Sequence, residues 1–223
     1  MAPSEATGDE PDGRPRIERG GRSWERGTPQ AVAWIQQGFR MGVTIASSVP
    51  PVFDAYATIV DPWSSGENPM LRFDRDFSGA VADGAWLDPE HAAARDASKG
   101  WQVQARLVEI LSEFGSNSWW LGYLDTGASD VVFEDVPSVR LSMQWPYKVV
   151  KAGPAQALSW RVLLPDLIFP VDRSWCVSTG WDDSWTSLGG SAPMIEALVA
   201  DPVIAARQVF VDQDATPPGH VAV

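Results

Sequence analysis

One cysteine and two histidines are the only candidates for thiol catalysis or a zinc site in this chain: Cys176, His91 and His220. A cysteine nucleophile needs a neighbouring base to activate it. Cys176 lies in an alternating apolar stretch, where a small buried thiol is expected, and both histidines are far from it in sequence. We therefore expect Cys176 to be structural. Their spacing matches no common zinc motif, so no metal site is predicted.

Carboxylates could provide a different chemistry. Asp172, Asp182, Asp183 and Glu134 could serve as general acid and base if two of them face each other across one cleft. Asp182 and Asp183 could also bind Mg²⁺ or Ca²⁺, although adjacent aspartates are more often ordinary turn residues. The sequence contains neither a P-loop nor a Gly-x-Ser-x-Gly motif. We predict no catalytic residue and no cofactor, and the enzyme question stays open, with a non-enzyme favoured.

Tryptophan is concentrated in the second half of the chain. Seven of the twelve tryptophans lie between Trp119 and Trp185. This side chain is costly to expose and is a frequent anchor in binding sites. Trp181 falls in a predicted turn, where it could meet a partner, whereas alternation places Trp185 on a sheet face. The candidate binding residues lie around this turn: Asp172, Arg173, Trp181, Asp182, Asp183 and Trp185.

The pair Asp172–Arg173 at the start of this stretch has two interpretations. An arginine beside an aspartate and a tryptophan can pair with the acid and lie on the indole ring. The first interpretation, which we favour, is structural: the pair fixes the start of a strand. In the second interpretation the arginine binds a carboxylate or a partner.

The charge balance limits the classes of partner. The chain has 17 basic and 29 acidic residues, a net charge of −12. Because this field repels phosphate backbones and anionic lipids, neither nucleic acid nor a membrane is an expected partner. A basic protein partner suits the charge, which also favours solubility. The sequence shows no signal peptide and no apolar stretch long enough to cross a bilayer, and its single cysteine fits a reducing compartment. We expect a cytoplasmic protein.

The periodicity of apolar residues predicts the elements that position these side chains. Residues 1–27 are rich in Gly, Pro, Arg and Glu and are expected to form a flexible tail, followed by a single domain over 28–223. Helices are predicted at 29–41, 73–81, from Asp88, at 101–114 and after Ser191. Strands are predicted at 53–60, 118–124, 130–134, 138–143 and 145–151, with a hairpin of 174–179 and 184–188 that Gly189–Gly190 ends. Because consecutive strands are too close for parallel crossovers, the fold class is α+β, a mostly antiparallel sheet packed with several helices.

Three stretches together resemble a family of uncharacterised actinobacterial proteins. They are Ile45–Pro62, with its Val-Pro-x-x-Phe-x-Ala-Tyr-Ala segment before a proline, then Trp119–Tyr123, and Phe169–Gly190 with its Pro-x-Asp-Arg-x-Trp-x-Val-x-Thr segment, an acidic turn and Gly-Gly. The chain has Asp61-Pro62 where that family often has His-Pro, so any role of that histidine is lost here. The resemblance implies no catalytic residue. The layout is also loosely similar to the SUKH superfamily of bacterial immunity proteins, which are α+β, cytoplasmic and often acidic.

These observations lead to one main hypothesis and two alternatives. The main hypothesis is a cytoplasmic, non-enzymatic binding protein that holds a basic protein partner through an acidic, tryptophan-bearing face; its most specific form is an immunity-like protein that binds a basic toxin. The first alternative is an enzyme or small-ligand binder with a carboxylate-lined pocket, for a sugar-like ligand that stacks on indole rings. The second is a structural subunit of a larger assembly, which would expose an apolar patch.

Overall fold

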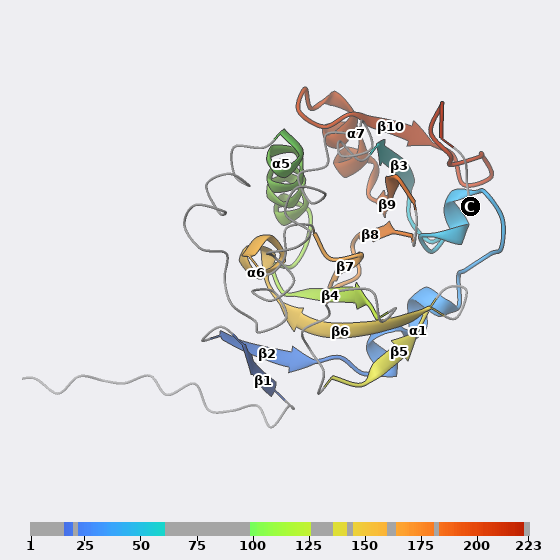
Figure 1. Ribbon diagram of the computed structural model, residues 1–223. Helices are drawn as coiled ribbons and strands as arrows, with labels where there is room; N and C mark the ends of the chain where they lie inside the picture. The colour runs from blue at the N-terminus through green and yellow to red at the C-terminus, as the bar shows by residue number, and fades with distance from the viewer. Residues whose placement is uncertain are drawn as a thin grey trace, which may run out of the picture.

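The computed structural model describes residues 16–19, 22–60, 99–125, 136–141, 145–159, 164–180 and 183–220, with side chains from Trp24 onwards except Ser159. These residues form a ten-stranded sheet in which every strand pair is antiparallel, with helices packed against it (Figure 1). The helices are α1 (Pro29–Gln36), a 3₁₀ turn η1 (Ile45–Ser47), α5 (Lys99–Glu113), α6 (Pro154–Ser159) and α7 (Ala192–Ala200). The predicted α+β class with a mostly antiparallel sheet is confirmed.

The order of the strands in the sheet differs from their order in the sequence. It is β1-β2-β6-β4-β7-β8-β9-β3-β10, with β5 pairing with β6. The bounds of the strands are β1 Arg16–Arg19, β2 Arg22–Arg26, β3 Ala55–Val60, β4 Trp119–Leu124, β5 Ser138–Arg140, β6 Pro146–Ala152, β7 Leu167–Pro170, β8 Cys176–Thr179, β9 Trp185–Gly190 and β10 Ala206–Val209. In an antiparallel sheet the end of one strand lies beside the start of its neighbour. Loops far apart in sequence therefore meet at each end of this sheet.

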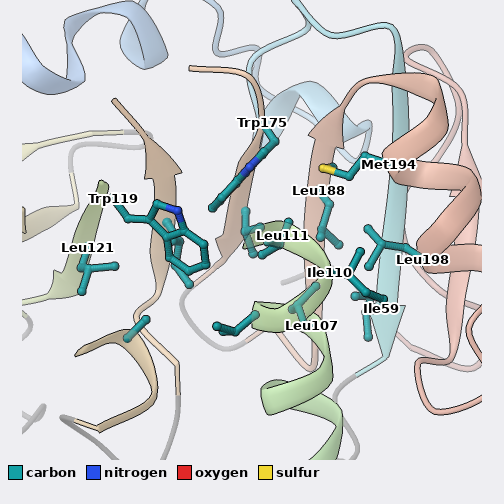
Figure 2. Packing of buried hydrophobic residues seen from close by; sticks show 14 of the residues in the cluster. Ile59, Leu107, Ile110, Leu111, Trp119, Leu121, Trp175, Leu188, Met194 and Leu198 are labelled. Carbon is teal, nitrogen blue, oxygen red and sulfur yellow. The ribbon is translucent and has the colours of Figure 1, made fainter. Parts of the chain in front are cut away.

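One face of the sheet is covered by α5, α6 and α7. The apolar stripe of α5 buries Leu107, Ile110 and Leu111 against the sheet, as its i, i+3, i+4 spacing predicts (Figure 2). On the sheet side, Trp119 and Trp175 meet edge to face with their ring centroids 4.9 Å apart. This side holds the largest buried cluster, so it is the main core of the protein.

The other face is covered by α1. Here Val32 and Ile35 are fully buried in a cluster with side chains from β4, β5, β6, β7 and β8. The Trp34 ring meets Phe169 of β7 edge to face, 5.4 Å between centroids. Alternation along the strands explains the division, since Trp119 and Leu121 point to the first face and Leu124 points to the second. The sheet is therefore packed on both faces.

The N-terminal segment departs from the sequence prediction. The expectation that residues 1–27 form a flexible tail is wrong for 16–19 and 22–26, which form a hairpin that joins the sheet through β6. Trp24 is fully buried in the main core, and Glu25 forms an ion pair with Lys151. Pairing with β6 and burial of the Trp24 ring thus order this segment, although its sequence has little apolar periodicity.

Other differences concern the bounds of elements. Helix α1 ends at Gln36 rather than near 41, and Gly189–Gly190 belong to β9 instead of ending it. A Cβ added at Gly189 would lie 2.4 Å from the Phe53 ring, so the close packing of that ring needs a glycine. Strands β7 and β10 were not predicted. The helices expected at 73–81 and from Asp88, and the strand expected at 130–134, lie outside the described residues.

Candidate functional site

Two of the tryptophans in the candidate binding stretch are core residues. Trp175 is fully buried beside Trp119, and Trp185 keeps 5% of its surface exposed. Because alternation places them inside the sheet layers, neither offers much contact area to a partner. Trp181, the indole expected at the tip of the turn, lies outside the described residues together with Asp182.

Asp172 and Arg173 form the turn between β7 and β8. The Asp172 carboxylate accepts hydrogen bonds from the backbone N–H of Ser116 (2.8 Å), the backbone N–H of Ser174 (3.1 Å) and the Ser174 hydroxyl (2.8 Å). Burial alone would raise the pKa of Asp172, but the hydrogen bonds from Ser174 and Ser116 outweigh it and lower that pKa. These contacts tie the turn to the segment before β4, so the observed role of Asp172 is structural.

Arg173 contacts the ring of Trp34 on α1, not that of Trp175, its near neighbour in sequence. Its backbone is in the left-handed region, with φ of 59°. Its guanidinium carbon lies 5.6 Å from the centroid of the Trp34 ring on α1, within the range of a cation–π contact. The side chain therefore links the β7–β8 turn to the helix on that face, rather than reaching toward Asp183.

The two described acids of the predicted site lie apart in the sheet. Asp172 precedes β8 and Asp183 follows it, so the two carboxylates lie at opposite ends of a strand that spans about 10 Å. The expectation of one acidic, tryptophan-bearing face over 172–190 stays a prediction, because Trp181 and Asp182 lie outside the described residues. Among the described residues, Trp175 and Trp185 are buried and the two acids are separated along β8. The same separation gives no support to a cleft lined by both Asp172 and Asp183. Glu134 lies outside the described residues.

A different set of carboxylates meets at one end of the sheet. Asp125 follows β4, Asp166 precedes β7 and Asp183 precedes β9, and the strand order and register bring these three positions to the same end, which we call the acidic end. The Asp166 carboxylate accepts a hydrogen bond from the backbone N–H of Leu124 (2.8 Å), which connects two of the loops directly.

The electrostatics of Tyr147 support this convergence. Tyr147 is buried at the start of β6, at the same end of the sheet. Burial raises the pKa of its phenol, and the negative charges of Asp166 and Asp183 raise it further. The charges of both carboxylates therefore act on one side chain at the acidic end. Lys148 offsets part of the charge, since its ammonium lies 3.4 Å from a carboxylate oxygen of Asp125.

The sequences that follow β3 and β4 add further acids. Residues 61–98 begin where β3 ends, opposite Trp185, and contain eight acidic and three basic residues. Residues 126–135 follow Asp125 and contain three acidic residues and no basic one. Together these two segments carry a net charge of −8, out of −12 for the whole chain. Most of the acidic excess thus lies in segments that leave the sheet at the acidic end.

The cysteine and the one described histidine are not paired. Cys176 is fully buried, and burial raises the pKa of its thiol. It lies opposite Gly189, about 13 Å along β9 from Trp185, whose ring is the neighbour of His220 at 6.1 Å between centroids. The structural interpretation of Cys176 agrees with this position. His91 lies outside the described residues.

Sequence reasoning missed a contact between Ser184 and His220. The Ser184 hydroxyl oxygen and His220 Nδ1 are 2.5 Å apart. A serine beside an imidazole resembles half of a nucleophilic site, but such a site also needs a group that orients the imidazole. Among the described residues, no carboxylate bonds to the other nitrogen of His220, so the contact is best understood as a tether for the C-terminal segment. No spacing in the sequence could have indicated a pair 36 residues apart.

Two further kinds of site are absent from the described part of the chain. It contains no group of three or more His, Cys, Asp or Glu side chains that could hold a metal ion. Within the same ranges, no helix has the length and apolar character needed to cross a membrane.

Comparison with known proteins adds no further assignment. No protein-family model matches the chain, and neither a curated protein nor a solved structure is significantly similar to it.

Proposed function

We propose that this protein is a non-enzymatic binding protein that holds a basic protein partner at its acidic end. The observation that carries the proposal is the meeting of Asp125, Asp166 and Asp183 at one end of the sheet, where two acidic chain segments also leave it. A concentrated negative field of this kind steers a positively charged partner and increases its rate of association. The net charge of −12 suits a basic protein partner better than a nucleic acid or an anionic membrane.

The most specific form of the proposal is an immunity-like protein that acts in the cytoplasm on a basic toxin. It is supported by the antiparallel α+β fold and the uneven charge distribution. The alternative of a carboxylate-lined catalytic or sugar-binding pocket has less support, because Asp172 and Asp183 lie at opposite ends of β8. We therefore retain the binding protein as the single proposed function.

The proposal predicts that charge at the acidic end contributes to binding more than equal charge elsewhere. The test variant is Asp125→Asn/Asp183→Asn, and the probe is a lysine-rich peptide titrated at low ionic strength. We expect affinity to fall about 3- to 10-fold, the scale of two exposed charge pairs, and the remaining binding to weaken as salt is added.

The matched control removes the same charge from the opposite end of the sheet. Asp54→Asn/Glu113→Gln changes two exposed acids, one before β3 and one at the end of α5. The proposal predicts that this variant binds the peptide like the wild type. Equal losses for the two variants would show that only the overall charge matters, and would remove the support for a site at the acidic end.

A further inference from the structure

A row of polar side chains crosses four neighbouring strands on the face of the sheet that α1 also covers. Ser178 of β8 lies opposite Ser187 of β9, Ser187 opposite Thr58 of β3, and Thr58 opposite Arg207 of β10. Side chains directly opposite each other in antiparallel strands have their Cβ atoms about 4.5–5.5 Å apart. The register therefore places three hydroxyls and a guanidinium in one continuous line, which we call the polar row.

The three hydroxyl residues of the polar row are buried and Arg207 is half-buried, and part of the row's hydrogen-bonding capacity is unused. Thr58 and Ser187 are each 1% exposed and Ser178 is 7% exposed. Within the described part of the chain, neither the Thr58 hydroxyl nor Arg207 Nε has a hydrogen-bond partner. Buried polar atoms in native proteins are almost always hydrogen-bonded, and these two belong to directly opposed residues. The two unpaired groups are suited to a ligand that accepts hydrogen bonds.

The C-terminal segment contacts the row at Arg207. Arg207 Nη2 donates hydrogen bonds to the backbone carbonyls of Ala215 (3.1 Å) and Thr216 (3.2 Å). Further along, His220 is held by Ser184 at the start of β9. Because β3 lies between β9 and β10, residues 214–220 join two anchors that lie on either side of β3. We call residues 214–220 the C-terminal strap.

Arg207 donates these hydrogen bonds from the edge of its guanidinium that commonly binds an oxyanion. Nε and Nη2 form one edge of an arginine, and this edge binds carboxylate or phosphate oxygens with two parallel hydrogen bonds. Here strap carbonyls occupy Nη2 while Nε is unused. The strap also brings in an acid: hydrogen bonds from Thr216, and then the nearby charge of Arg207, lower the pKa of Asp214. The strap thus offers Arg207 the oxygens that an anionic ligand would offer.

We propose that Arg207 and the Thr58 hydroxyl form a binding site for the carboxylate or phosphate group of a small ligand, and that the C-terminal strap is its built-in competitor. When the strap is docked, its carbonyls accept the hydrogen bonds of Arg207 Nη2. When it swings away, Nε and Nη2 bind the oxyanion and the hydroxyls of the polar row accept or donate the remaining bonds. The proposal concerns the face at β3 and β10, so it does not depend on the acidic end.

The test compares the wild type with a variant whose strap is loosened. His220→Ala removes the distal tether, and Ala215→Leu overfills a position that is 4% exposed; neither substitution replaces a residue of the polar row. Inorganic phosphate and acetate are titrated separately, so the stronger binder identifies the preferred class. We expect the loosened variant to bind one of them at least 10-fold more tightly than the wild type. No gain for either anion would overturn the proposal.

Two substitutions in the loosened variant test the site itself. Arg207→Lys keeps the positive charge but lacks the two-donor edge, and should remove the gain. Thr58→Val keeps the shape but lacks the hydroxyl, and should weaken binding several-fold. If both substitutions leave the affinity for the anion unchanged, Arg207 and Thr58 do not form its binding site.

A measurement on the wild type keeps the proposal testable if the loosened variant does not fold. The backbone N–H of Ala215 is bonded to the carbonyl of Val43 (2.8 Å) and should exchange with solvent slowly. If anion and strap compete, saturating phosphate or acetate must speed up this exchange. Unchanged exchange with both anions would contradict the competition.

Discussion

At the scale of single residues, the position along a strand decides whether a tryptophan packs or binds. Trp175 and Trp185 belong to the stretch that is richest in indoles, yet both are buried. Burying an indole removes about 150–250 Å² from water, worth up to about 4–6 kcal/mol. The alternating pattern predicted the face of Trp185 correctly. It also suggested Cys176 as a buried thiol, which agrees with its full burial.

The carboxylate of Asp172 stabilises the turn between β7 and β8 through its hydrogen bonds. Asp172→Ala removes an acceptor of three hydrogen bonds, so we expect the free energy of unfolding at pH 7 to fall by about 1–2 kcal/mol. Because folding lowers this pKa from its ordinary value of 3.8, the charged form stabilises the fold above that pH, and the contribution is lost as the pH falls through the folded value. Denaturant titrations at pH 7 and pH 3 measure the difference in the free energy of unfolding between the variant and the wild type. A difference that does not narrow in acid would contradict a role for the charge.

At the scale of elements, the sequence predicts those that have a long, clear period. The i, i+4, i+7 stripe of α5 and the alternation of β4 identify both elements almost to the residue. Strand β7 has four buried residues without alternation, and β10 has only four residues, so neither carries a pattern of its own. Their conformation depends on pairing with neighbours that are distant in sequence. The hairpin of β1 and β2 was missed for the same reason.

Trp24 tests whether that hairpin is part of the fold. Its ring is fully buried in the main core, so Trp24→Ala should lower the free energy of unfolding by about 3–5 kcal/mol. Chemical denaturation is the measurement, and the exposed Gln30→Ala at the start of α1 is the control, with an expected change below about 0.5 kcal/mol. If Trp24→Ala were as stable as the control, residues 22–26 would be a dispensable tail.

At the scale of the whole molecule, the order of the strands determines which residues share a surface. Asp172 and Asp183 are close in sequence but lie at opposite ends of β8, whereas Asp125, Asp166 and Asp183 meet although they are far apart along the chain. The sequence predicted an acidic protein and an antiparallel sheet. It could not predict the location of the acids, because β4 lies between β6 and β7 in the sheet and no local pattern specifies that order. The polar row was hidden for the same reason, since its four members come from four strands.

The most direct test of the proposed function is to map where a basic ligand contacts the protein. Backbone amide resonances of the full chain, recorded by NMR during titration with a lysine-rich peptide, report this residue by residue. The proposal predicts salt-sensitive shifts centred on Asp125, Asp166 and Asp183, with little change at Asp54 and Asp172. Shifts centred on the Asp172 turn, or spread evenly over the surface, would contradict a binding site at the acidic end.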